Sequence, residues 1–508
     1  MRSIHSFALT ISICLALPCV AQENLEFKIA SQEGLIGADE VKGTGNELYL
    51  NASYSQLNIF KLDLSDISST PICKNIQLID KSKKEYFFGG ANKDTIVYFN
   101  GMFASIYDTW SKSTKKKTIY YRVYDKNGAP VLTDPKELFS VDCNKDMENS
   151  NSTYTLCFSG NRSKIALLFV NGTNKPQPEY TLISVNAKDG SVGSTNKING
   201  DYNGSKFSAQ LETMDDAGNT ELTFYTLDQN NKVIQRYWGQ LKPNEGAFSG
   251  VKEFPLDKTK NRYSSIEEKS NDGKLIVSGM YSSMSGPEDG TFYAVIDSKT
   301  KKVITETYTP FSGNTASMLG YKLKIKGEKS EAPGSRNFVS RHFVTLNGNR
   351  YLVAEHSVES IGADKLYYNI SMEVLVSKYN AEGKNEWQAV IPKQTYPGRN
   401  PGMSSGSFQL LEGKNELYVL FLDHEENEKT SLNNYSISDY KPIKRSYGAN
   451  VACVKVTEKG ELSKSILFKN PEQAPAYVPN MSTIKRENVY LVSYQSLDDR
   501  RFATITVK

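Results

Sequence analysis

The feature that most constrains the fold of this chain is a short unit of turns and strands that recurs from end to end. Each copy starts with a turn rich in asparagine, glycine or aspartate and continues into a run of β-branched and aromatic residues. The clearest runs are Glu47–Tyr54, Thr95–Phe103, Lys164–Val170, Glu221–Leu227, Lys274–Tyr281, Arg350–Ser357, Glu416–Asp423 and Asn488–Tyr494. Long helical periodicity is missing from the sequence, so the pattern predicts an all-β protein.

Several runs are followed by a second strand that ends in a tight turn with glycine. The clearest examples are Tyr120–Gly128, Leu182–Gly190, Glu373–Gly383 and Val454–Gly460. Glycine supplies the positive φ angle that such turns require. The unit repeats every ~50–75 residues, whereas blades of a propeller usually span ~40–50. Loop insertions would explain the excess, and the candidates are Ser111–Lys117, Met284–Gly290, Gly362–Tyr367 and Glu425–Lys441.

The repeated unit favours sheets that stack around a common axis. A small sheet cannot bury both of its faces alone, and its open edges invite aggregation. We therefore predict a single β-propeller of seven or eight blades in residues 22–508. The strand Leu25–Ile29 is expected to complete the last blade beside Arg501–Val507 and close the ring. Two β domains joined near Lys324–Ser335, the most linker-like stretch, are the alternative.

The amino-terminal residues indicate export. Met1–Ala21 has early basic residues, an apolar stretch and small residues at its end, which is the order of a secretory signal peptide. A lipoprotein signal at Cys19 is the competing interpretation, although Leu17 and Pro18 fit it poorly. We expect a periplasmic, extracellular or cell-envelope protein without a transmembrane segment, because no later stretch approaches the ~20 apolar residues of a membrane span. The 61 basic and 57 acidic residues are finely mixed, which argues against nucleic acid as a partner.

The carboxyl-terminal half resembles an uncharacterised family of exported bacterial β-propeller-like proteins. The similarity rests on Gly279–Tyr281, Gly290–Asp297, Tyr351–His356, Gly383, Trp387 and Ile391–Gln394. It implies the fold and export, and it implies no activity. The segment Tyr379–Trp387 is also similar to quinoprotein-type propeller repeats, whose tryptophan packs between blades. Only one copy is present and Asn380 replaces the usual aspartate, so we predict interblade packing of Trp387 and no quinone or other cofactor.

Two acid–histidine pairs are the candidate ligand-binding residues. Glu355-His356 and Asp423-His424 each stand at the end of a strong run, in comparable positions of the repeat. If the blades are radial, these ends meet at one rim, and the side chains could form a metal or proton-transfer site. The alternative is separate solvated rim residues, because adjacent side chains on a strand point to opposite faces.

The other candidate features have structural explanations beside the functional ones. Cys143 and Cys157 bracket a polar loop and could form a disulfide, or they could be separate thiols in strands. The basic run Lys112–Lys117 is either a patch for an acidic polymer or lipid, or a solvated loop tip.

No motif with a complete catalytic context is present in the sequence. Gly402–Gly406 matches Gly-x-Ser-x-Gly in letters only, because it lies in a Gly/Ser-rich turn and lacks the strand-to-helix context of a nucleophile elbow, and no phosphate-binding glycine loop can be found. The leading hypothesis is therefore a non-enzymatic binding or scaffold propeller that recognises a protein or glycan through its rim loops. The alternative is a glycan-active hydrolase or lyase with carboxylates near the central channel.

Overall fold

The structure is a computed structural model of the 508-residue chain. It describes residues 25–29, 39–40, 48–51, 56–62, 69–77, 95–111, 113–142, 152–172, 178–198, 206–227, 233–243, 249–253, 256–257, 259–269, 273–282, 289–300, 302–311, 313–319, 338–361, 367–395, 407–433, 440–443, 448–472, 476–477, 484–486, 488–495 and 500–508.

The described strands form eight antiparallel sheets, numbered I to VIII in chain order. Sheet I contains β2 (Asp39–Glu40), β3 (Leu48–Asn51), β4 (Gln56–Leu62) and β5 (Ser69–Gln77). Sheet II contains β6 (Thr95–Phe99), β7 (Met102–Ser111), β8 (Lys116–Asp125) and β9 (Lys136–Asp142). Sheet III contains β10 (Ser152–Phe158), β11 (Lys164–Asn171), β12 (Glu179–Asn186) and β13 (Val192–Ile198).

The next four sheets follow the same sequential order. Sheet IV contains β14 (Lys206–Met214), β15 (Thr220–Leu227), β16 (Val233–Leu241) and β17 (Ser249–Glu253). Sheet V contains β18 (Asn261–Lys269), β19 (Lys274–Ser282), β20 (Gly290–Asp297) and β21 (Val303–Pro310). Sheet VI contains β22 (Phe338–Leu346), β23 (Asn349–Ile361), β24 (Tyr367–Tyr379) and β25 (Asn385–Ile391). Sheet VII contains β26 (Gln409–Glu412), β27 (Leu417–Asp423), β28 (Asn450–Val456) and β29 (Leu462–Lys469).

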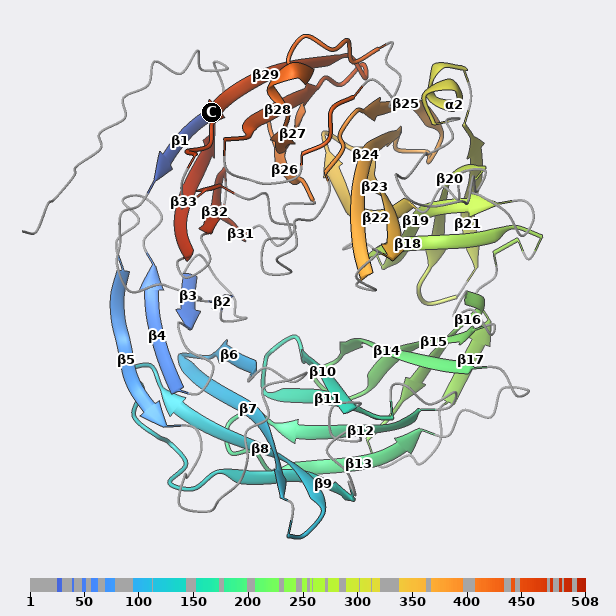
Figure 1. Cartoon of the computed structure of the whole chain (residues 1–508). Coiled ribbons are helices and arrows are strands. Elements are labelled where there is room, and N and C mark those ends of the chain that lie inside the picture. The colour runs from blue at the N-terminus through green and yellow to red at the C-terminus, as the bar shows by residue number, and fades with distance from the viewer. Residues whose placement is uncertain are drawn as a thin grey trace, which may run out of the picture.

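Sheet VIII joins the two ends of the chain. It contains β30 (Ala476–Tyr477), β31 (Ile484–Arg486), β32 (Val489–Gln495) and β33 (Arg500–Val507). The first strand, β1 (Leu25–Ile29), pairs antiparallel with β33, from Leu25 opposite Val507 to Ile29 opposite Ala503. The predicted pairing of the amino-terminal strand with the last sheet is therefore confirmed. In Figure 1 the blue β1 lies beside the red β33, and the sheets succeed one another around a common centre.

Helices are a minor part of the described structure. The helix α2 (Gly313–Met318) lies between sheets V and VI, and the 3₁₀ helix η2 (Glu425–Asn427) follows β27. In the part of the chain that is described, no helix has the length and hydrophobicity needed to cross a membrane.

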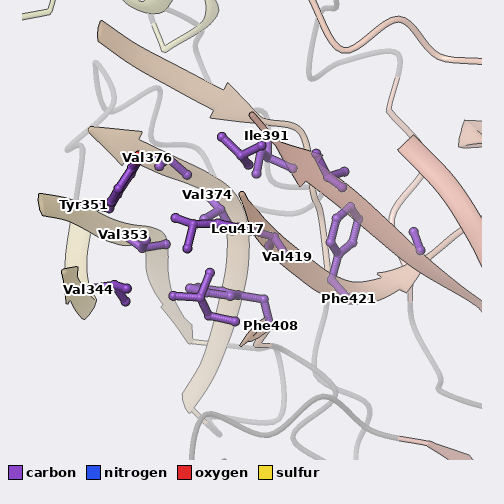
Figure 2. Packing of buried hydrophobic residues seen from close by; sticks show 14 of the residues in the cluster. Val344, Tyr351, Val353, Val374, Val376, Ile391, Phe408, Leu417, Val419 and Phe421 are labelled. Carbon is purple, nitrogen blue, oxygen red and sulfur yellow. The ribbon is translucent and has the colours of Figure 1, made fainter. Parts of the chain in front are cut away.

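The cores lie between neighbouring sheets. Along β27, Leu417, Val419 and Phe421 pack towards sheet VI, whereas Tyr418, Leu420 and Leu422 pack towards sheet VIII. A strand with both faces covered is apolar at every position, which explains its unbroken hydrophobic run. Figure 2 shows the core between sheets VI and VII, in which Val353 and Val374 meet Leu417, Val419 and Phe421.

Sheets V and VI share one core across the segment that suggested a linker. Ile276 and Met280 of β19 pack in the same cluster as Phe338 of β22 and Leu352 of β23. Residues 324–335, the proposed linker, lie outside the described residues.

At several junctions between sheets, a glycine in a turn packs closely on an aromatic ring of the preceding sheet. Gly190, with φ +66°, lies against the ring of Tyr121 in the preceding sheet, so that an added Cβ would come within 2.6 Å of it. Gly383 packs in the same way on Tyr293, and Gly460 on Trp387. The indole Nε1 of Trp387 in sheet VI also donates to the Glu458 carbonyl of sheet VII, at 2.9 Å. The predicted interblade packing of Trp387 is therefore confirmed.

The structure changes two of the expected boundaries. The run Thr95–Phe103 contains a turn at Asn100-Gly101, with φ angles of +45° and +76°, and spans parts of two strands. The segment Ser111–Lys117 is the tip of the β7–β8 hairpin, with strand residues at both of its ends. Lys117 is 1% exposed, and its Nζ lies 2.8 Å from Asp108 Oδ2, so this lysine does not belong to a solvated tip.

Candidate functional site

Glu355 in β23 is the centre of a buried group of charged and polar side chains. Its Oε1 accepts a hydrogen bond from Lys393 Nζ at 2.8 Å. Its Oε2 accepts from Arg341 Nε at 3.1 Å, and the Arg341 Nη2 atom lies 3.0 Å away. The Ser371 hydroxyl contacts both Glu355 and Lys393. We call Glu355, Arg341, Ser371 and Lys393 the Glu355 network.

Two β-bulges bring these side chains together. In β22, Ser340 lies opposite Ala354 and His342 opposite Val353, which leaves Arg341 as an extra residue. In β24, Met372 and Glu373 lie opposite the single residue His356. A bulge bends the strand and redirects its side chains. These two irregularities place a base beside Glu355 and an acid beside His356.

His356 is paired with a second buried carboxylate. Its Nδ1 lies 3.0 Å from Oε2 of Glu373, and both side chains are buried. The imidazole is stacked on Phe338, with ring centroids 5.2 Å apart. A carboxylate next to one ring nitrogen fixes the orientation of the imidazole.

Lys393 reaches the network from a segment that crosses to the next sheet. Burial lowers the pKa of Lys393, and the attraction of Glu355 opposes this shift. Two residues further on, Thr395 exchanges both backbone hydrogen bonds with Ser371, at 2.8 and 3.1 Å. The Ile443 amide donates to the Gln394 carbonyl at 2.9 Å, which ties the segment to the loop after η2.

Asp423 stands at the end of β27 and is held by a different set of partners. Its Oδ1 accepts from Asn427 Nδ2 at 2.8 Å and from the Tyr440 hydroxyl at 2.9 Å. Lys464 of β29 forms an ion pair with its Oδ2, and the Lys464 ammonium also donates to the Asn427 carbonyl at 2.8 Å. We call Asp423, Asn427, Tyr440 and Lys464 the Asp423 network.

His424 has a local structural role. Its Nδ1 accepts a hydrogen bond from the Glu426 amide at 3.2 Å, so the imidazole caps the amino terminus of η2. The imidazole is half-exposed, unlike that of His356. The second acid–histidine pair therefore consists of a buried carboxylate and a capping histidine.

The structure places the two predicted pairs in neighbouring sheets. Glu355 and His356 lie in sheet VI, and Asp423 and His424 lie at the end of β27 in sheet VII. The bridge from Ser371 through Thr395 to Ile443 links the two networks along the backbone. Across the ranges that the structure describes, no three His, Cys, Asp or Glu side chains are grouped as a metal site would require.

Sequence reasoning missed basic side chains that form buried ion pairs, among them Lys464 of the Asp423 network and Lys117, which pairs with Asp108. Lys464 in β29 and Lys117 in β8 each alternate with apolar residues that face a core, namely Leu462 and Ile466 in one strand and Ile119 and Tyr121 in the other. A lysine in the core-facing register of a strand needs a buried partner, because an unpaired charge there is costly. This register is the signal that could have identified both lysines.

The carboxylates of the two networks are not accessible to a substrate. Glu355 and Asp423 are each 1% exposed. A general acid or nucleophile must reach the reacting atom of its substrate within hydrogen-bonding distance. In this conformation both carboxylates act as internal anchors for Lys393, Arg341 and Lys464.

The predicted cysteine pair falls partly outside the described residues. Cys157 lies half-buried in β10, whereas Cys143 is outside the description. Cys453 in β28 is buried, and burial raises the pKa of its thiol.

Comparisons with known proteins do not identify a family. No family of known proteins matches the sequence, and no curated protein does. Among solved structures, the Dos1 propeller has a TM-score of 0.42 and 9% identity, covering 94% of this chain and 95% of that one. The β-propeller domain of the Trilobed protease from Pyrococcus furiosus has a TM-score of 0.30 and 11% identity, over 70% and 97% of the two chains. For an α-L-arabinofuranosidase from Fusarium graminearum the values are 0.31 and 10%, over 71% and 94%.

Proposed function

We propose that this chain is an exported, single-domain β-propeller of eight blades, closed by β1, which binds a protein or glycan through its rim and does not catalyse a reaction. The signal-like segment Met1–Ala21 supports export. The eight sheets and the pairing of β1 with β33 support the closed ring.

The observation that carries the proposal is the neutralisation of the buried carboxylates. Glu355 is held by Lys393 and Arg341, and Asp423 is held by Lys464. Buried ion pairs of this kind fix the arrangement of the strands around them. Glu355, His356 and Asp423 therefore belong to the interior scaffold, and recognition of a ligand falls to the surface.

The turns at one end of the sheets form a polar surface suited to recognition. We call this surface the hairpin-turn rim; it consists of those turns between the first and second strands, and between the third and fourth strands, that lie in the described ranges. Neighbouring turns are hydrogen-bonded to one another. The Asn161 amide donates to Asp216 Oδ1 at 2.7 Å, between sheets III and IV, and Asn347 Nδ2 donates to the Lys414 carbonyl at 2.9 Å, between sheets VI and VII. Ordering the surface in advance lowers the entropy cost of binding.

Binding and turnover are tested together on the mature chain, residues 22–508. We expect it to bind at least one component of a glycan array or a protein array, and to leave a panel of polysaccharides uncleaved. Turnover of any polysaccharide without a detectable ligand would favour the hydrolase or lyase alternative and contradict the proposal.

Export has its own test. The full chain is expressed in a Gram-negative host, the cells are fractionated, and the intact mass of the product is measured. We expect an exported product that begins at Gln22. An uncleaved protein that remains in the cytoplasm would contradict export.

A further inference from the structure

A cavity of about 250 Å³ lies on the hairpin-turn rim between sheets IV and V. Its sheet IV wall consists of Thr213, Asp215, Asn219, Glu221 and Gln240. Its sheet V wall consists of Gly273, Lys274 and Ser298, from the β18–β19 turn, the start of β19 and the β20–β21 turn. The cavity therefore occupies a junction between two sheets.

Other junctions are filled at the corresponding place. Between sheets II and III, V and VI, and VI and VII, a glycine of the second hairpin turn packs on an aromatic ring of the preceding sheet, as Gly190, Gly383 and Gly460 show. The equivalent turn of sheet V, Asp297–Lys302, contains no glycine. Its residue Ser298 forms part of the cavity wall instead. The cavity therefore lies at a junction whose second sheet lacks this glycine.

The sheet IV wall is held in place by its own hydrogen bonds. The backbone amide and the side-chain amide of Asn219 each donate to the Asp215 carboxylate at 2.7 Å. Partial burial raises the pKa of Asp215, but the hydrogen bonds from Asn219 and the turn amides outweigh it, so the pKa is lowered. The Thr213 hydroxyl donates to Glu221 Oε2 at 3.2 Å. The acceptors of this wall are therefore fixed before any ligand arrives.

We propose that this cavity binds one neutral sugar residue of a glycan, an inference that rests on the proposed binding function and assigns its ligand and its place. The walls carry hydroxyl, amide, carboxylate and ammonium groups, so both donors and acceptors line a small space. Each hydroxyl of a sugar ring can donate and accept, so it can pair with either kind of group.

The charge of the lining residues and the volume of the cavity restrict the class of ligand that could bind. Lys274 offsets one of the two carboxylates, Asp215 and Glu221, so the lining does not favour an anion such as phosphate. A volume of about 250 Å³ suits a single ring and not the side of a folded partner.

The test compares a variant that fills the cavity with a matched surface variant. Ser298→Tyr places a ring in the cavity. Ala381→Tyr places the same ring at the corresponding position of the sheet VI turn, Asn380–Gly383, where residue 381 is exposed. Gln240→Ala removes one amide from the wall. Thermal unfolding of all three variants checks that they fold.

Binding is measured by saturation-transfer NMR and calorimetry with glucose, galactose, mannose and N-acetylglucosamine, and with their β-linked disaccharides. We expect the mature chain to bind at least one of these probes, and we expect Ala381→Tyr to bind it equally well. Ser298→Tyr should weaken binding at least about tenfold, and Gln240→Ala by about fivefold.

The outcomes separate this inference from the proposed function. Sugar binding that Ser298→Tyr leaves unchanged would overturn the site, while the binding function would stand. Binding of a protein from the array with no sugar binding would overturn the sugar class. Polysaccharide turnover with no ligand on either array would overturn both.

Discussion

The Nζ atom of Lys393 lies 2.8 Å from Oε1 of Glu355, and both side chains are almost completely excluded from solvent. Taking two charges out of water costs several kcal/mol per ion, and their mutual attraction offsets that cost only when the geometry is good. Arg341 contributes a second cation to the same carboxylate and is 20% exposed. Glu355 therefore needs its partners in order to stay buried, and the segment that carries Lys393 is held against sheet VI as a result.

Lys393→Met should destabilise the protein strongly. The variant leaves Glu355 with Arg341 as its remaining cation, and removing one partner of a buried pair costs about 3–5 kcal/mol. In urea denaturation followed by tryptophan fluorescence, the midpoint should fall with little change in slope.

The double variant Glu355→Gln/Lys393→Met is the matched control. It removes both charges, so it should recover more than half of the stability that Lys393→Met loses. If Lys393→Met changes the unfolding free energy by less than about 0.5 kcal/mol, as surface substitutions usually do, the assigned role of the pair is contradicted.

The sequence pattern predicts several strands correctly, and the boundary that it misses has a physical cause. Runs such as Lys164–Val170 and Lys274–Tyr281 correspond to β11 and β19, because strands buried on both faces must be apolar throughout. The run Thr95–Phe103 contains the boundary between two strands, and Asn100-Gly101 within it is a strong hairpin signal, although the apolar pattern continues on both sides. Aromatic residues on both sides of that turn concealed it.

Only part of the candidate site could be predicted from the sequence, because its residues come from separate parts of the chain. Glu355 and His356 stood out as an acid next to a histidine at the end of a strong run. Arg341 and Glu373 reach them through bulges, and a bulge shifts register in a way that alternation alone does not show. Lys393 arrives from a segment after β25 that has no periodic pattern.

Gly460→Ala should cost more stability than Gly348→Ala. Both glycines have a positive φ, +83° and +77°, so alanine adds a similar backbone penalty of about 1–2 kcal/mol at each. At Gly460 the new Cβ would also lie 2.7 Å from the Trp387 ring, whereas nothing lies within 4 Å at Gly348.

Differential scanning calorimetry of the two glycine variants separates backbone strain from the contact between sheets. We expect Gly460→Ala to lower the Tm by several degrees more than Gly348→Ala does. Adding Trp387→Leu to Gly460→Ala should bring the two mutations below additivity, because they disturb the same contact. Equal effects of the two alanines would indicate that the turn of sheet VII does not press on sheet VI.

Removing β1 should destabilise the whole protein and not sheet VIII alone. Residues Leu25–Ile29 cover the outer edge of β33, and Leu25 packs against the core between sheets VII and VIII. Deletion of residues 22–29 from the mature chain exposes that edge, so the Tm should fall by several degrees and aggregation should increase. Deletion of residues 22–24, which leaves β1 intact, is the control. An unchanged Tm for the longer deletion would contradict the proposed closure of the ring.

His342 in β22 should make stability depend on pH. Burial is the main cause that lowers its pKa to about 4; the charge of Arg341 acts in the same direction, and Glu412 and Glu355 act in the opposite direction. The ring lies edge-on to Phe408, with centroids 5.5 Å apart. In the unfolded chain the pKa returns to about 6.5. Between about pH 6.5 and 4 the unfolded state therefore binds the additional proton, and stability falls as the pH is lowered through this range.

The comparison of wild type with His342→Gln isolates this effect from the titration of carboxylates. From pH 7 to pH 4.5 the wild type should lose about 2 kcal/mol more unfolding free energy than the variant, after allowance for the partial exposure of the ring. Above about pH 7.5 the histidine is almost entirely neutral in both states, so the two curves should run parallel there. Urea titrations at half-unit intervals of pH give the two curves. Parallel curves down to pH 4.5 would show that His342 takes up its proton equally well in the folded protein.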